Sequence, residues 1–155
     1  MWTTVRLIIT LVTIKGWHSR QLDFILDYPQ ADVDREIYMK LLKGFEIKEK
    51  QSKEGYCLKL LKNIYGLKKA GRVWNQHLHK GLLKLNYSQS KHYLCLYYRK
   101  DTMLAVYIDD CILIANTKQL VETAVKEMAK SFKITNEGEV DEYLGVKVER
   151  LQDKT

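Results

Sequence analysis

Two neighbouring aspartates, Asp109 and Asp110, are the residues best suited to chemistry, because they interrupt an apolar run that covers residues 103–115. Carboxylates buried in such a run are costly unless positive charge compensates them, and Mg²⁺ can do so because it takes oxygen ligands. A plain β-turn is the alternative, since aspartate is common in turns. An Asp-Asp turn usually needs Gly or Asn, whereas Cys111 and Ile112 follow here. The pattern leaves both a turn and a divalent-metal site open.

A third carboxylate, Asp23, also lies inside an apolar stretch, at residues 20–26. If this stretch is a strand that pairs beside the hairpin with Asp109 and Asp110, the three carboxylates converge. Three carboxylates that hold two divalent ions are the components of in-line phosphoryl or nucleotidyl transfer. We therefore expect these three aspartates to act together.

Basic and aromatic residues dominate the middle of the chain. The net charge is +7, and positions 55–100 contain ten Lys and Arg residues but no Asp or Glu. Tyrosines and one tryptophan are interleaved with these cations. A segment of one charge sign with aromatic side chains suits a polyanion with stackable bases. A solvated basic face without a partner is an equally simple interpretation.

The composition limits the class of protein. A chain of 155 residues with 46% hydrophobic residues fits one globular domain over residues 1–155 rather than a disordered chain. Its three cysteines include no C-x-x-C pair and do not match a disulfide framework or a structural zinc site. We expect an intracellular protein without a membrane span, since the apolar stretch 7–14 is far shorter than the roughly 20 residues that cross a bilayer.

The spacing of apolar residues predicts helices mixed with hairpin-forming strands, which is an α+β fold. Residues 67–85 have helical spacing that places Trp74 on the apolar face, so Trp74 is expected in the core. Cys111 is expected to be a small core residue of a strand. The predicted helices are 3–15, 67–85 and 120–132, and the predicted strands are 21–26, 36–41, 56–61, 94–98, 103–107, 111–115 and 143–149.

Five sequence blocks follow one another along the chain. They are 21–31 (QLDFILDYPQA), 36–45 (EIYM, then KGF), 58–74 (LKLLKNIYGLKKAGRVW), 107–110 (YIDD) and 143–147 (YLGVK). In order and in spacing, these blocks resemble the motifs of the reverse transcriptases of copia-type LTR retrotransposons. A lone YxDD box is a weak signal, but the ordered set covers about residues 3–150 and is specific.

The resemblance implies the palm of a right-hand polymerase with part of the fingers, in which an antiparallel sheet packs on helices. It implies RNA-directed DNA synthesis from deoxynucleoside triphosphates (dNTPs) on an RNA or DNA template with a primer. Asp23 and Asp109 match the acids that bind two Mg²⁺ or Mn²⁺ ions, and Asp110 matches a third, more loosely coupled acid. Asp23, Asp109 and Asp110 are therefore the predicted catalytic and metal-binding residues.

The resemblance also implies substrate contacts. Tyr28 corresponds to an aromatic residue that could exclude a ribose 2′-hydroxyl, and simple packing beside Pro29 is the alternative. The predicted dNTP-binding residues are Phe24, Tyr28 and Gly44. The predicted nucleic-acid-binding residues are Lys68, Lys69, Arg72, Tyr107, Leu144 and Gly145.

Some features depart from the family pattern. Asp27 stands where the family usually has Ala, near the expected nucleotide, so its carboxylate is expected to repel a triphosphate or to misplace a metal ion. The domain is expected to be truncated at both ends, without the upstream fingers, the thumb and RNase H. Family members normally belong to a Gag-Pol type polyprotein with integrase and RNase H, and act in cytoplasmic virus-like particles. The alternatives are a catalytically dead nucleic-acid-binding remnant and an interaction module without a nucleic-acid role.

Overall fold

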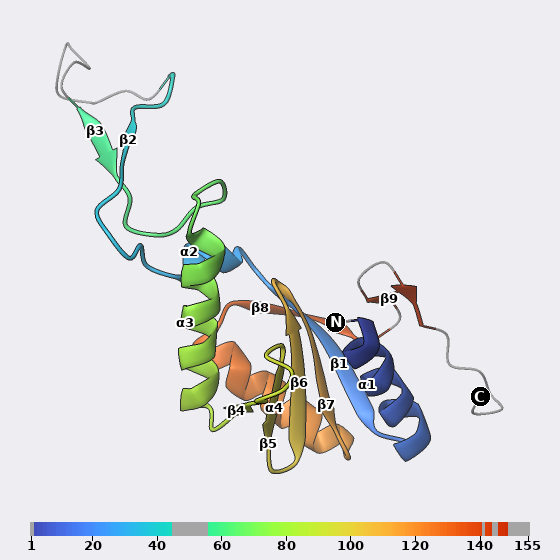
Figure 1. The fold of residues 1–155 in the computed structure, drawn as a ribbon. Helices are drawn as coiled ribbons and strands as arrows, with labels where there is room; N and C mark the ends of the chain where they lie inside the picture. Colours follow the sequence, from blue (N-terminus) through green and yellow to red (C-terminus); the bar gives the residue numbers. More distant parts are fainter. Residues whose placement is uncertain (1, 45–55, 141, 144–145, 149–155) are drawn as a thin grey trace.

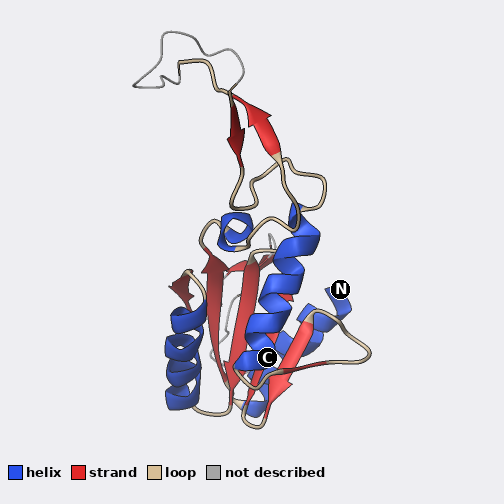
Figure 2. Ribbon diagram, turned by 90° about the vertical axis from the view of Figure 1, so that its left-hand side faces the viewer, coloured by secondary structure: helices blue, strands red, loops and turns tan. Residues whose placement is uncertain are grey.

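The computed structural model describes residues 2–44, 56–140, 142–143 and 146–148. Its main sheet has six antiparallel strands in the order β4-β5-β6-β7-β1-β8, with helices on both faces (Figures 1 and 2). The helices are α1 (Trp2–Lys15), α2 (Asp27–Gln30), α3 (Ala70–Lys84) and α4 (Lys118–Ser131). The strands are β1 (His18–Phe24), β2 (Tyr38–Lys40), β3 (Cys57–Lys59), β4 (Ser88–Gln89), β5 (Leu96–Arg99), β6 (Thr102–Tyr107), β7 (Asp110–Ala115), β8 (Ile134–Gly138), β9 (Glu142–Tyr143) and β10 (Val146–Lys147).

Strand β7 is central because both of its faces are buried. Cys111 and Leu113 point into the core that α3 and α4 cover. Ile112 and Ile114 point into a second core, which contains Ile8 of α1 and other apolar residues. Figure 1 shows α1 on the opposite side of the sheet from α3. A strand buried on both faces reads as a continuous apolar run, and this explains why the sequence predicts β7 well.

Helices α3 and α4 close the larger core. Trp74 and Cys111 are both buried in it, which confirms the two predictions made for them. Thr117 caps α4, because its side-chain oxygen accepts a hydrogen bond of 3.3 Å from the Leu120 backbone N–H. Gly81 allows α3 to approach the end of α4 closely, since a Cβ at this position would lie only 2.2 Å from the Phe132 ring.

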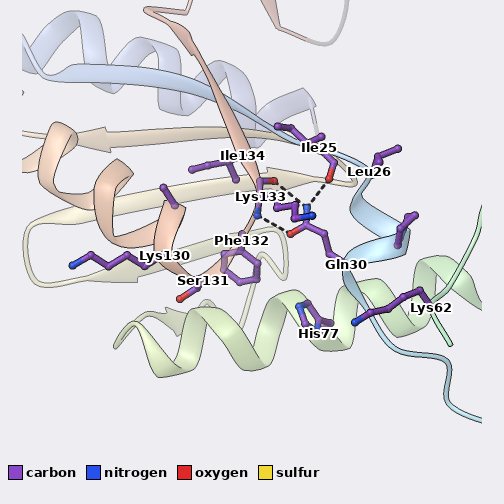
Figure 3. A pocket seen from close by; sticks show the side chains of 12 residues that line it. Ile25, Leu26, Gln30, Lys62, His77, Lys130, Ser131, Phe132, Lys133 and Ile134 are labelled. Carbon is purple, nitrogen blue, oxygen red and sulfur yellow. Dashed lines mark hydrogen bonds between the residues drawn. The ribbon is translucent and has the colours of Figure 1, made fainter.

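The edge strand β8 is held by Gln30, and the sequence does not predict it. The Gln30 side-chain amide donates to the backbone carbonyls of Ile25, at 2.8 Å, and of Lys133, at 3.0 Å. Its oxygen accepts from the Lys133 N–H at 2.8 Å (Figure 3). These three bonds join the end of β1 to the start of β8, so β8 forms without an apolar pattern of its own.

Other elements differ from expectation at their bounds. The predicted strand 143–149 is instead two short strands, β9 and β10, which pair with each other in the described residues. Strand β4 is also absent from the predicted set. Strands β2 and β3 form a hairpin that projects beyond α2 and the start of α3 (Figures 1 and 2). Across the described residues, no helix has the length and apolar character needed to cross a membrane.

Candidate active site

The sheet brings the predicted carboxylates to one end. In the register of β1 and β7, Asp23 lies directly opposite Asp110. In the register of β6 and β7, Tyr107 lies opposite the same Asp110, so Ile108 and Asp109 form the turn. The strand that carries Asp23 therefore does pair beside the hairpin, as the sequence predicts. The turn interpretation of the aspartate pair is confirmed, because the tight turn places the carboxylates at the end of the sheet, whereas the metal interpretation stays a prediction.

The turn is strained and is held from two sides. Ile108 has a φ of 56°, a left-handed conformation that is unusual for a β-branched residue. The Trp74 indole Nε1 donates to the Ile108 carbonyl at 3.1 Å, and the Phe24 backbone N–H donates to the Asp109 carbonyl at 3.1 Å. Trp74 thus fixes the turn in addition to filling the core, a role that its position on an apolar helix face does not reveal.

The carboxylates at this end repel one another. Burial raises the pKa of Asp23 above its ordinary 3.8, and the charges of Asp109, Glu137 and Asp27 raise it further. Burial also raises the pKa of Asp110, and Asp109 and Asp23 add to the effect. Among the described residues, none of the three predicted metal-binding carboxylates forms an ion pair with a Lys, Arg or His.

This carboxylate set fits divalent cations in its chemistry, since hard oxygen donors without a cationic partner are what Mg²⁺ and Mn²⁺ prefer. The expected convergence of these three described side chains on one point is not borne out. Over the described ranges, no group of three His, Cys, Asp or Glu side chains is placed to hold a metal ion. Metal binding at Asp23, Asp109 and Asp110 remains a prediction.

A pocket of about 400 Å³ lies beside the turn, between the hairpin and α3. Tyr28 lines one wall, Tyr107 and Ile108 line another, and Gly71 and Trp74 contribute from α3. Its size falls within the range of small-molecule sites. The structure therefore brings together two of the predicted substrate residues, Tyr28 and Tyr107.

Other predicted substrate residues lie elsewhere. The Phe24 side chain is only 2% exposed and packs against the rings of Trp74, at 5.2 Å, and Phe132, at 5.6 Å, so it belongs to the core rather than to the pocket. Gly44 follows β2 in the projecting hairpin, with a φ of 85°, and does not line the pocket. Leu144 and Gly145 lie outside the described residues.

The predicted phosphate-binding cations gather at the start of α3. Lys68, Lys69 and Arg72 are exposed, and within the described residues none of them forms an ion pair. The first turn of α3 contains no acidic residue, so the positive end of the helix dipole adds to their charge. This end of α3 therefore attracts anions, although contact with a nucleic acid remains a prediction.

A second pocket, of about 650 Å³, lies on the other side of α3, and the sequence does not predict it. Lys62, His77, Lys130 and Lys133 are among its lining residues, and Phe132 is one of the apolar ones (Figure 3). Burial lowers the pKa of His77, and the charge of Lys62 lowers it further. Neither this pocket nor the one beside the turn is lined by any of the predicted catalytic carboxylates.

Asp27 is buried and does not line the pocket beside the turn, and the repulsion of a triphosphate expected of its carboxylate stays a prediction. Its side chain is only 1% exposed, and one of its oxygens accepts a hydrogen bond of 2.5 Å from the Tyr65 hydroxyl. This bond, together with burial and the charges of Asp27 and Asp109, raises the pKa of Tyr65 to about 12. Sequence reasoning missed the pair because no local pattern links positions so far apart.

The chain matches known proteins over almost its whole length. Residues 1–154 match the family described as Reverse transcriptase (RNA-dependent DNA polymerase). The Retrovirus-related Pol polyprotein from transposon TNT 1-94 of Nicotiana tabacum is 29% identical over 153 residues, which cover 96% of this chain and 11% of that protein. The corresponding polyprotein from transposon RE1 of Arabidopsis thaliana is 26% identical, with 96% and 10% covered.

A shorter relative is the putative transposon Ty5-1 protein of Saccharomyces cerevisiae, which is 28% identical over 131 residues, covering 82% of this chain and 42% of that protein. No solved structure matches the chain. The chain spans about a tenth of the length of the two plant polyproteins. Because the family match runs through nearly every residue, and because the relatives are retrotransposon Pol proteins, the chain belongs to the reverse transcriptase family of copia-type retrotransposons.

Proposed function

We propose that this chain is an RNA-directed DNA polymerase domain, with the palm and part of the fingers, that adds dNTPs to a primer 3′-hydroxyl. One observation carries the proposal. Asp23 lies opposite Asp110 in the sheet, and Asp109 stands beside them on a turn that two neighbours fix. Asp109 raises the pKa of both Asp23 and Asp110, and none of the three carboxylates has a cationic partner in the described residues, which supports a role in binding divalent cations.

In this proposal Asp23 and Asp109 hold two Mg²⁺ or Mn²⁺ ions, and Asp110 adds negative charge from the neighbouring position. When bound, such ions favour attack by the primer hydroxyl on the α-phosphate and stabilise the leaving pyrophosphate. The protein's own part is positioning, since the Ile108 turn and its two hydrogen bonds fix Asp109 relative to Asp23. Positioning and electrostatic stabilisation supply most of the catalysis in phosphoryl transfer.

The positions proposed for the substrates rest on the pocket beside the turn and on the basic residues at the start of α3. The dNTP binds beside Tyr28, which lines the pocket next to the turn and excludes a ribose 2′-hydroxyl, and Tyr107 on the same pocket contacts the nucleic acid. Lys68, Lys69 and Arg72 attract the phosphates of the template or primer. Salt-dependent binding of a primer–template duplex is a consequence of this arrangement.

The relatives supply the context of the proposal. Several of them are named as Pol or Gag-Pol polyproteins. We infer that this domain works as part of such a polyprotein, alongside integrase and RNase H, in cytoplasmic virus-like particles.

Primer extension tests the proposal. An RNA template with a DNA primer is extended in Mg²⁺ or Mn²⁺ by the unchanged chain and by Asp109→Asn. Asp101→Asn is the matched control, because Asp101 is also an exposed aspartate in a hairpin turn, between β5 and β6. We expect extension by the unchanged chain and by the control, and loss of extension in Asp109→Asn.

Two other outcomes contradict the proposal in different ways. No extension, together with duplex binding that weakens at high salt, would favour the nucleic-acid-binding remnant. No extension and no salt-sensitive binding would mean that the basic face at the start of α3 has no nucleic-acid role.

A further inference from the structure

Asp27 is a buried carboxylate that only one partner satisfies. Its Oδ1 accepts the hydrogen bond of the Tyr65 hydroxyl, at 2.5 Å. Its Oδ2 is buried and has no hydrogen-bond partner. A buried carboxylate with only one hydrogen-bonded oxygen lowers the stability of the folded protein compared with an apolar residue. The contact with Tyr65 is therefore the feature that distinguishes this side chain from a simple space-filling one.

Tyr65 links Asp27 to Tyr28, the residue that lines the pocket. Its ring packs on the Tyr28 ring, with 4.7 Å between the centroids and 42° between the planes. Tyr65 is 57% exposed, so a large part of its ring lies in solvent. An exposed ring keeps rotamer freedom unless a bond at its far end restricts it, and the Asp27 carboxylate provides that bond.

The backbone separates the roles of two adjacent residues. Leu26 has a φ of 50°, and this left-handed residue turns the chain from β1 into α2. Asp27 then points into the protein, while Tyr28 lines the pocket. The Tyr28 hydroxyl end lies against the first turn of α3, 3.5 Å from where a Cβ of Gly71 would be. Tyr28 is thus confined between Tyr65 and α3.

We infer that Asp27 is a positioning residue: through the Tyr65 hydroxyl it fixes the Tyr28 ring at the wall of the pocket, and so sets how strictly the site distinguishes deoxyribose from ribose. The inference rests on the proposed function, because it assigns the nucleotide sugar to Tyr28. It deepens that function by naming residues that do not touch the substrate. A ring free to rotate clears space for a 2′-hydroxyl, whereas a fixed ring excludes it.

The first test needs no catalysis. Tyr65→Phe removes the hydroxyl and leaves the Asp27 carboxylate buried without any hydrogen bond, so the unfolding equilibrium constant is expected to rise by about 10-fold or more. Adding Asp27→Ala removes the orphaned charge and is expected to recover most of this loss. Additive effects in this double-mutant cycle would show that the two side chains are not coupled and would overturn the inference.

The second test measures sugar selection. The kcat/KM for a dNTP is divided by that for the matching ribonucleotide, on one template, in the unchanged chain and in the Asp27→Ala/Tyr65→Phe variant. We expect this ratio to fall by about 10-fold, through a gain for the ribonucleotide rather than a common loss for both substrates. Asp27→Asn keeps an oxygen that can accept the Tyr65 bond and is expected to retain the ratio.

Tyr98→Phe is the control, because Tyr98 is an exposed tyrosine of β5 that does not line the pocket. It is expected to leave both the ratio and the stability unchanged. Synthesis with an unchanged ratio in the folded double variant would overturn the inference and leave the proposed function intact. No synthesis by any folded variant would overturn the proposed function, and with it the assignment of the sugar to Tyr28.

Discussion

Two acidic features near the end of β1 have opposite surroundings: one is a group of three carboxylates, and the other is the single carboxylate of Asp27. Asp23, at the end of β1, joins Asp109 and Asp110 in a group that has no cationic partner among the described residues. Asp27, just beyond the strand, is buried and holds the Tyr65 hydroxyl. The carboxylates of the first group remain available to ligands, whereas the Asp27 carboxylate accepts a hydrogen bond inside the protein. The contrast separates residues that could meet substrates from one that orients its neighbours.

Removing the Asp23 carboxylate from the first group should reduce activity more than any other change considered. Asp23→Asn is expected to reduce primer extension by at least about 100-fold, since a bound metal ion contributes several kcal/mol of transition-state charge stabilisation. In buffer without divalent ions, the free energy of unfolding should stay the same or rise, because the repulsion from Asp109, Glu137 and Asp27 is removed. Single-turnover extension and urea unfolding of the same preparations measure both quantities. Parallel losses of activity and stability would show that Asp23 is a structural residue.

The Trp74 side chain anchors the turn that carries Asp109. Trp74→Phe keeps an aromatic ring in the core but loses the Nε1 hydrogen bond to the Ile108 carbonyl. We expect the free energy of unfolding to fall by about 1–3 kcal/mol, from the lost volume and the lost bond together. Extension should fall as well, because the turn that carries Asp109 loses one of its two anchors. Trp17→Phe, in the other core, is the control and should affect stability without a specific loss of extension.

The difference between the two acidic features also marks what the sequence can predict. Asp109 and Asp110 interrupt an apolar run, so their strands and their turn follow from a local pattern. The pairing of Asp23 with this hairpin is confirmed, but it depended on a hypothesis about which strands are neighbours. The Asp27–Tyr65 bond is different, because it depends on a loop that returns to α2 from far along the chain. No periodicity of apolar residues in the sequence indicates such a contact.

Strand β8 shows the same limit within the fold. The strand Ile134–Gly138 is short and its residues are mostly polar, so it lacks the alternation of apolar and polar residues that identifies a strand. The strand forms because Gln30 fixes its start and β1 offers a partner edge. The polar side chain that stabilises it lies more than a hundred residues earlier. The sequence predicts a strand whose burial produces an apolar pattern. It does not predict a strand that a distant polar side chain holds in place.

The titration of Asp23 and Asp110 reports on the repulsion within the first group. The pKa of Asp23 and that of Asp110 are raised above 3.8 in the folded protein, so the native state binds these protons more tightly than the unfolded state. Their contribution to the free energy of unfolding should therefore decrease as the pH rises from about 3.8 through the raised values. Carboxyl-detected NMR can follow both groups. Asp109→Asn should lower both pKa values, and so should Mg²⁺. Unchanged pKa values in the variant would show that Asp109 does not interact with the other two carboxylates.

The smallest expected effect tests a property that the two acidic features share. Ile108 and Leu26 are both left-handed, and each directly precedes an aspartate, Asp109 or Asp27. Both side chains are more than half exposed, so replacing them loses little burial. Because Asn tolerates this conformation better, Ile108→Asn and Leu26→Asn should each raise the free energy of unfolding by up to about 1 kcal/mol. The gain should be larger at position 108, where the residue is β-branched.

Activity distinguishes these two variants even where stability does not. The turn at Ile108 presents Asp109, so relaxing it should change primer extension through the geometry of the carboxylates. The turn at Leu26 instead places Asp27 and Tyr28, so relaxing it should change the ratio of deoxyribonucleotide to ribonucleotide incorporation and leave the rate with the correct nucleotide close to that of the unchanged chain. If both variants changed the same kinetic quantity, the two acidic features would have to be regarded as one site.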